Sequence, residues 1–186
     1  GGRVLANNIN VPYYTSFEIE KSNVTISNGW HTNIGNIILK VLAAPGHTPG
    51  SLIYVFGDFA LTGDTLFTEG VGRPDLGEDI RSNAKNLYLT LMNIIWQLPD
   101  AMMILPGHTN QQIEYGKAVM SKVLELKKSQ AVFKMTQDEF IDWIQKSPKP
   151  KPQNFEIIKK INIGRMEMLS IDDIRELEVG SNRCAV

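Results

Sequence analysis

The stretch that decides the fold runs from Val41 to Leu76 and reads VLAAPGHTPGSLIYVFGDFALTGDTLFTEGVGRPDL. It contains two apolar runs of strand length, joined by a Pro-Gly-His-Thr-Pro-Gly segment, and a third run that ends at Asp64. Two prolines and two glycines in six residues favour a tight turn. The stretch therefore predicts three neighbouring strands, with His47 on the first connection and Asp64 at the end of the third strand.

A similar arrangement occurs downstream, where Ile104–His108 reads ILPGH. His47, Asp64 and His108 each follow an apolar run, and the C-terminal ends of strands are where a sheet collects functional groups. Imidazole nitrogens and carboxylate oxygens are ligands of divalent transition metals. Gly63 precedes Asp64 and another glycine precedes His108, so we expect room for a close approach at both. The pattern predicts a metal site built from these three side chains.

Each candidate also has a structural alternative. A histidine on a turn is often a hydrogen-bonded surface residue, and we interpret His31 in this way, as an exposed loop residue. Cys184 lies near the chain end and is interpreted as an incidental thiol. Arg73 is a candidate substrate-binding residue, but we favour an ion pair between Arg73 and Asp75 that braces their own loop.

Composition limits the class of protein. The chain has 186 residues, 42% of them hydrophobic and 21% charged, which is typical of a globular protein. A formal net charge of −1 argues against a nucleic-acid partner. A single cysteine favours a reducing compartment, and we expect a cytoplasmic protein. No apolar run reaches the length of a membrane span, so no membrane association is expected.

Hydrophobic periodicity predicts a layered α/β arrangement. We expect a domain over residues 1–130, followed by a helical extension over 131–186. Thr136 and Glu139 have the spacing of a helix-capping box. The predicted strands are 24–26, 37–44 (buried on both faces), 51–56, 59–62 and 102–105. The predicted helices are 3–8, 86–98, 113–127, 136–145, 154–163 and 170–177.

Four motifs together carry a family resemblance. They are GHTPGS, TGDTLF, GVGRPDL and LPGH, which begin at Gly46, Thr62, Gly70 and Leu105. In this order and spacing they resemble the metallo-β-lactamase fold family, over roughly residues 1–108. The resemblance is closest to the branch with the glyoxalase II thioesterases and the persulfide dioxygenases. The G-R-x-D element and the closing Asn-Arg-Cys lean toward the dioxygenases.

This resemblance implies a four-layer αββα sandwich with a C-terminal helical tail. His47 resembles the third metal histidine of the family and His108 the last one. Asp64 resembles the carboxylate that bridges two metals or completes a mononuclear site, and so is the expected catalytic residue. The family's leading H-x-H-x-D-H motif is absent. Because that motif normally precedes a Gly-Gly or Gly-Ala-Arg helix start, we expect the chain to begin just after it, with the N-terminal part of the fold missing.

The function implied by the resemblance is a persulfide (sulfur) dioxygenase that uses Fe(II) and acts on glutathione-type thiols. One alternative is a glyoxalase II-like zinc hydrolase of thioesters, and another is a catalytically inactive binding module. The complete protein would hold one or two Fe(II) or Zn²⁺ ions. Without the missing motif, this chain alone is expected to bind metal weakly and to show little activity. A small-molecule thiol or thioester is the expected partner, and the resemblance is compatible with a homodimer.

Overall fold

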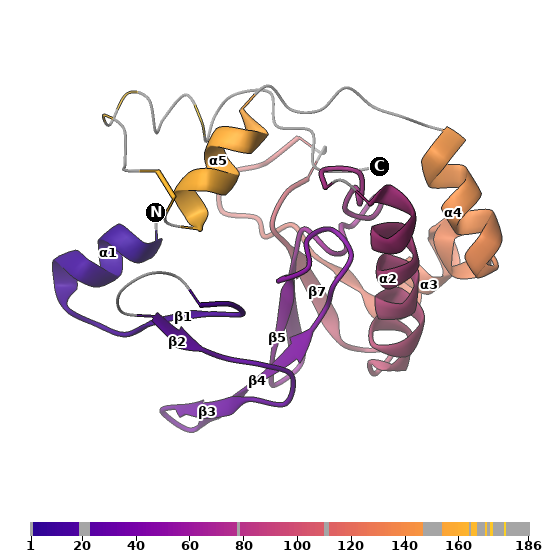
Figure 1. Ribbon diagram of the computed structural model, residues 1–186. Helices are drawn as coiled ribbons and strands as arrows, with labels where there is room; N and C mark the ends of the chain where they lie inside the picture. The colour runs from indigo at the N-terminus through magenta and orange to yellow at the C-terminus, as the bar shows by residue number, and fades with distance from the viewer. Residues whose placement is uncertain are drawn as a thin grey trace. The chain divides into compact units, whose positions relative to one another are not determined.

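The computed structural model describes residues 2–18, 23–77, 79–109, 112–146, 154–163, 165–166, 170, 172 and 177. The chain divides into two compact units (Figure 1). Unit 1 comprises residues 1–26 and 150–183, and unit 2 comprises 27–149 and 184–186. These boundaries differ from the expected division after residue 130, because the helix at 137–146 packs into the core of unit 2.

Unit 2 is built on a six-stranded sheet with the order β3-β4-β5-β6-β7-β8. Only β6 and β7 pair in parallel among these neighbours, and the other pairs are antiparallel. The predicted α/β class is therefore confirmed. The bounds of the strands are β3 His31–Ile34, β4 Ile37–Ala43, β5 Leu52–Phe56, β6 Phe59–Gly63, β7 Met103–Pro106 and β8 Ser121–Lys122.

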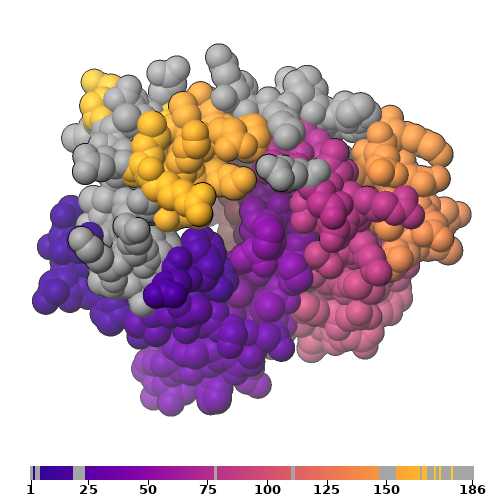
Figure 2. All heavy atoms as spheres, in the orientation of Figure 1, coloured from indigo at the N-terminus to yellow at the C-terminus, as the bar shows by residue number. Residues whose placement is uncertain are grey.

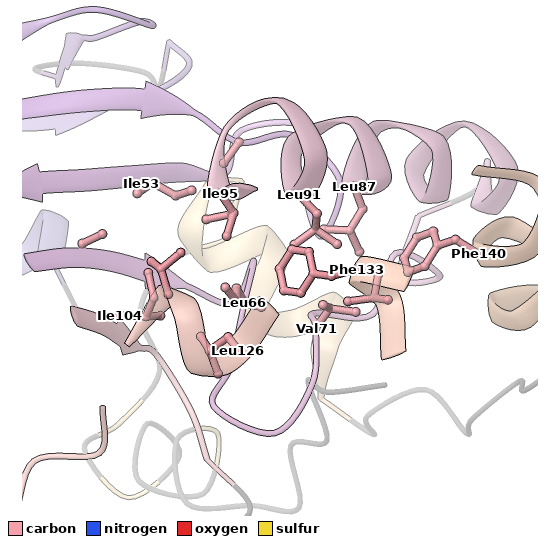
Figure 3. Packing of buried hydrophobic residues seen from close by; sticks show 14 of the residues in the cluster. Ile53, Leu66, Val71, Leu87, Leu91, Ile95, Ile104, Leu126, Phe133 and Phe140 are labelled. Atoms are coloured by element: carbon pink, nitrogen blue, oxygen red, sulfur yellow. The ribbon is translucent and has the colours of Figure 1, made fainter. Parts of the chain in front are cut away.

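Helices cover one face of this sheet. They are α2 Ile80–Asn93, η1 Ile95–Gln97, α3 Val123–Ser129, η2 Ala131–Lys134 and α4 Gln137–Lys146. Figure 3 shows Ile53 and Ile104 of the sheet in the same buried cluster as Leu87 and Leu91 of α2. All four of these side chains are fully buried. Since α2 lies in the connection from β6 to β7, the crossover required by parallel pairing also supplies the core.

The prediction that residues 37–44 are buried on both faces is wrong for the first part of the strand. Ile37 and Ile38 are each 52% exposed, whereas Val41 and Ala44 are fully buried. The N-terminal end of β4 pairs with the edge strand β3, beyond the helices that form the core. The atoms of this hairpin form part of the surface in the space-filling view (Figure 2). The run of apolar residues alone did not distinguish the exposed first part of β4 from its buried second part.

Two further predictions in unit 2 are corrected. His31 is exposed as expected, but it lies in the strand β3 and not in a loop. Residues 112–120 form no helix, and the predicted helix 113–127 is reduced to β8 and α3. Gly116 has a φ of 79°, which is incompatible with a continuing α-helix. Ile113, which contributed to the helical spacing, is 70% exposed.

The helix boundaries follow their caps. Asp79 accepts a hydrogen bond from the Ser82 N–H at 2.9 Å, so α2 begins earlier than the predicted residue 86. The capping box predicted before α4 is confirmed, because Thr136 Oγ1 accepts from the Glu139 N–H and Glu139 accepts from the Thr136 N–H. None of the helices in the described ranges is long and apolar enough to cross a membrane.

Unit 1 contains the helix α1 Gly2–Ile9, the strands β1 Tyr13–Thr15 and β2 Asn23–Thr25, and the helix α5 Phe155–Asn162. The two strands pair in parallel, and the Ile26 N–H donates to the Thr15 carbonyl at 2.8 Å. The predictions of a helix at 3–8, a strand near 24–26 and a helix at 154–163 are confirmed. Most of the predicted helix 170–177 lies outside the described residues.

A buried-core prediction follows from α2. We expect Leu91→Ala to lower the free energy of unfolding by about 2–5 kcal/mol, because it opens a cavity between helix and sheet. Leu89→Ala is the matched control on the same helix, since Leu89 is 38% exposed, and should cost no more than about 0.5 kcal/mol. Urea denaturation followed by tryptophan fluorescence measures both, and equal losses would contradict the packing described here.

Candidate metal centre

His47 is buried on the turn that follows β4, and its ring is fixed by one hydrogen bond. The Nδ1–H donates to the carbonyl of Arg73 at 2.9 Å. Because a carbonyl can only accept, this bond places the ring proton on Nδ1 and leaves the lone pair on Nε2. Burial lowers the pKa of His47, and the nearby Asp64 opposes this shift only in part. The imidazole is therefore neutral near pH 7, with Nε2 directed at Asp64.

Asp64 lies directly after β6, and its two carboxylate oxygens face two different histidines. Oδ2 is 3.6 Å from His47 Nε2, and Oδ1 is 2.6 Å from His108 Nδ1. The shorter contact is a hydrogen bond, while the longer one is not. The three residues predicted from the sequence are thus brought together, with the aspartate in the middle.

His108 reaches Asp64 because β6 and β7 run in parallel. Gly63 is paired with Pro106, and the Gly107 N–H donates to the Gly63 carbonyl at 2.8 Å. The two strands therefore deliver Asp64 and His108 to the same edge of the sheet. The hydrogen bond to Asp64 raises the pKa of His108, so this half-exposed ring is readily protonated. The Phe67 ring lies edge-on to it, with ring centroids 6.5 Å apart.

Two glycines allow this close assembly. A Cβ at Gly107 would lie 2.8 Å from Asp64 Oδ1, and a Cβ at Gly72 would lie 1.7 Å from the Asp64 carbonyl oxygen. The close approach predicted at Gly63 is wrong, because a Cβ there would meet nothing within 4 Å. Gly63 instead has a φ of 51°, which favours glycine for conformational reasons.

Arg73 is buried, with only 1% of its side chain exposed. Its Nε and Nη2 each donate to a carboxylate oxygen of Asp75 at 2.6 Å, a bidentate ion pair. This geometry agrees with the reading in which the pair braces its own loop. Since the same loop supplies the carbonyl that holds His47, the brace also orients the imidazole. Substrate contact by Arg73 stays a prediction.

Glu69 and Thr109 also contribute to the site, although no sequence motif points to them. Thr109 Oγ1 donates to Glu69 Oε1 at 2.9 Å, and the Thr68 hydroxyl also donates to Glu69. These bonds tie the loop after β6 to the residue that follows His108. No local pattern could reveal this contact, because Glu69 and Thr109 are 40 positions apart.

The donor atoms fit a divalent transition metal in part. Two ligand bonds of about 2.1 Å at a tetrahedral angle separate their donors by about 3.4 Å. The 3.6 Å between His47 Nε2 and Asp64 Oδ2 is close to this value. The 2.6 Å between His108 and Asp64 leaves no room for an ion between those two atoms. Among the described residues, no three His, Cys, Asp or Glu side chains are arranged around a single point. Cys184 lies outside the described residues.

In the metal-free protein the pKa values of the two histidines are shifted in opposite directions from 6.5. The pKa of His108 is raised above 6.5. Its ion pair with Asp64 therefore contributes fully to the free energy of unfolding below pH 6.5, and this contribution is lost as pH rises through the raised pKa. The pKa of His47 is lowered. The neutral, buried imidazole therefore contributes to the free energy of unfolding above pH 6.5, and this contribution is lost as pH falls through the lowered pKa.

We therefore expect Asp64→Asn to lower the pKa of His108 measured by NMR titration of the imidazole protons. Asp58→Asn is a suitable control, because Asp58 is an exposed carboxylate at the other end of β6. An unchanged His108 titration in Asp64→Asn would show that the ion pair does not form in solution.

Comparison with known proteins agrees with this architecture. The mitochondrial persulfide dioxygenase ETHE1 of Mus musculus is 31% identical over 145 residues, which cover 77% of this chain and 54% of that protein. The hydroxyacylglutathione hydrolase of Dictyostelium discoideum is 31% identical over 130 residues, 64% of this chain and 46% of that protein. The crystal structure of a metallo-beta-lactamase from Staphylococcus aureus superposes with a TM-score of 0.80 at 28% identity, and the match covers 91% of this chain and 57% of the other.

The chain spans about half the length of the curated relatives it matches. Residues 12–108 match the sequence pattern of the Metallo-beta-lactamase superfamily. That segment contains the strands β4 to β7 and all three residues of the candidate metal centre. By this match and by its fold, the chain belongs to the metallo-beta-lactamase superfamily.

Proposed function

We propose that this chain forms part of a metal-dependent persulfide dioxygenase that acts on glutathione-type thiol substrates. In this proposal His47 Nε2, the Asp64 carboxylate and His108 are metal ligands, and Asp64 is the central one. The observation that carries the proposal is the 3.6 Å spacing between His47 Nε2 and Asp64 Oδ2, which suits a shared ion. The similarity to a persulfide dioxygenase over three quarters of the chain supports the reaction class.

Neighbouring residues orient the side chains that we propose as metal ligands. The Arg73 carbonyl keeps the proton of His47 on Nδ1, so that Nε2 presents a lone pair. Asp64 is held by the β6–β7 register and by the close packing at Gly107. For His108 to become a ligand, it must give up its direct hydrogen bond with Asp64. A bound Fe(II) would supply open coordination positions for oxygen and for a thiol persulfide.

A second candidate function is zinc-dependent hydrolysis of a thioester, as in glyoxalase II. Each oxygen of Asp64 faces its own histidine, so Asp64 would hold a second ion if His108 gave up its direct hydrogen bond. The similarity to a hydroxyacylglutathione hydrolase supports this alternative. A bound zinc ion would lower the pKa of a water molecule and polarise the thioester carbonyl.

The two functions are separated by metal content and by reaction. We expect the protein to hold one iron per chain and to consume oxygen with glutathione persulfide. Asp64→Asn should lower the rate at least about 100-fold, because it removes an anionic ligand. Asp58→Asn, on the exposed turn before β6, should stay within about twofold of the unaltered protein.

Two other results would favour a different function. Two zinc ions per chain with hydrolysis of a glutathione thioester, and no oxygen uptake, would identify the hydrolase instead. Absence of bound metal and of both reactions would favour a binding module that uses this fold without catalysis.

A further inference from the structure

The turn that carries His47 is attached to helix α2 by a hydrogen bond that the metal-ligand motif does not predict. Thr90 Oγ1 donates to the carbonyl of Pro45 at 2.8 Å, across 45 positions of sequence. Thr90 lies in the interior of α2 and is only 3% exposed. A buried hydroxyl and a partly buried carbonyl satisfy one another here, two residues before His47.

This use of a helical threonine is unusual. A threonine inside a helix commonly turns its hydroxyl back to the carbonyl of the preceding turn, and it is a weaker helix former than alanine or leucine. In α2 the Thr90 hydroxyl instead bonds outside the helix. The Thr90 hydroxyl therefore holds the neighbouring turn at Pro45 in place and adds no hydrogen bond within the helix.

A second contact lies one helical turn away. Gly46 approaches the backbone of α2 so closely that a Cβ on it would lie 2.4 Å from Leu87 Cα. Gly46 also has a φ of 148°, which disfavours other residues. Leu87 and Thr90 are three positions apart and so lie on the same face of the helix. One face of α2 thus holds Pro45 by a hydrogen bond and Gly46 by steric contact.

We propose that Thr90 is a positioning residue for His47. The hydroxyl fixes the backbone of the turn, while the Arg73 carbonyl fixes the ring, and both constraints are needed to direct Nε2 at Asp64. This inference rests on the proposed function only in treating His47 as a metal ligand. The placement of His47 by α2 can be tested in the metal-free chain.

The experiment compares Thr90→Val, which keeps the side-chain shape and removes the hydroxyl, with Thr90→Ser, which restores the hydroxyl. The first readout is the solvent exchange rate of the His47 Nδ1–H, followed by NMR in the metal-free 186-residue chain. We expect at least tenfold faster exchange in Thr90→Val and a rate within twofold of the unaltered chain in Thr90→Ser. The second readout is zinc affinity by calorimetry, which should fall about 10- to 100-fold in Thr90→Val only.

Tyr88→Phe is the matched control. The Tyr88 hydroxyl donates to the Met135 carbonyl at 2.9 Å, so this variant removes an equivalent bond from the same helix, away from the His47 turn. It should lower the melting temperature and leave both readouts within twofold. Thr90→Ala provides a second variant without the hydroxyl if Thr90→Val does not fold, and it should show the same losses.

The outcomes distinguish a failure of the positioning role of Thr90 from a failure of the proposed metal site. Equal exchange rates in Thr90→Val and the unaltered chain, or an equal increase in Tyr88→Phe, would overturn the positioning role of Thr90. No zinc affinity in the unaltered chain would count against the proposed metal site. In that case the exchange rate of the His47 Nδ1–H alone would decide whether Thr90 places His47.

Discussion

The parallel pairing of β6 with β7 is the constraint on which the candidate metal centre depends. It sets Gly63 opposite Pro106, and as a result Asp64 and His108 emerge at one edge of the sheet within hydrogen-bonding distance. Parallel neighbours require a crossover connection, and here that connection contains α2. The same helix buries the sheet and touches the His47 turn, so core packing and site geometry are properties of one element.

Glycine positions explain why the three strand ends can meet. Gly46 lies against α2, Gly72 against the Asp64 backbone and Gly107 against the Asp64 carboxylate. At each of these positions a side chain would lie within 3.0 Å of a neighbouring atom. The bidentate Arg73–Asp75 ion pair braces the loop that presents a carbonyl to His47. The site is thus held both by close approaches at the glycines and by side-chain hydrogen bonds.

The proximity of His47, Asp64 and His108 could be predicted from the sequence, because each follows an apolar run that ends in a turn or a glycine. Their supporting contacts could not. The bonds from His47 to Arg73, from Thr90 to Pro45 and from Thr109 to Glu69 join residues 26, 45 and 40 positions apart. Such pairs arise only from tertiary packing. The predicted helix over 113–127 failed for a local reason, because its apolar spacing ran across Gly116, whose φ is 79°.

We propose that His47 and Asp64 share a metal ion. Anomalous diffraction at the iron or zinc edge, from crystals of the chain equilibrated with that metal, tests it most directly. If the ion is shared, a peak should lie about 2.0–2.2 Å from both His47 Nε2 and an Asp64 carboxylate oxygen. A bound metal elsewhere, with these two atoms still 3.6 Å apart and nothing between them, would contradict it.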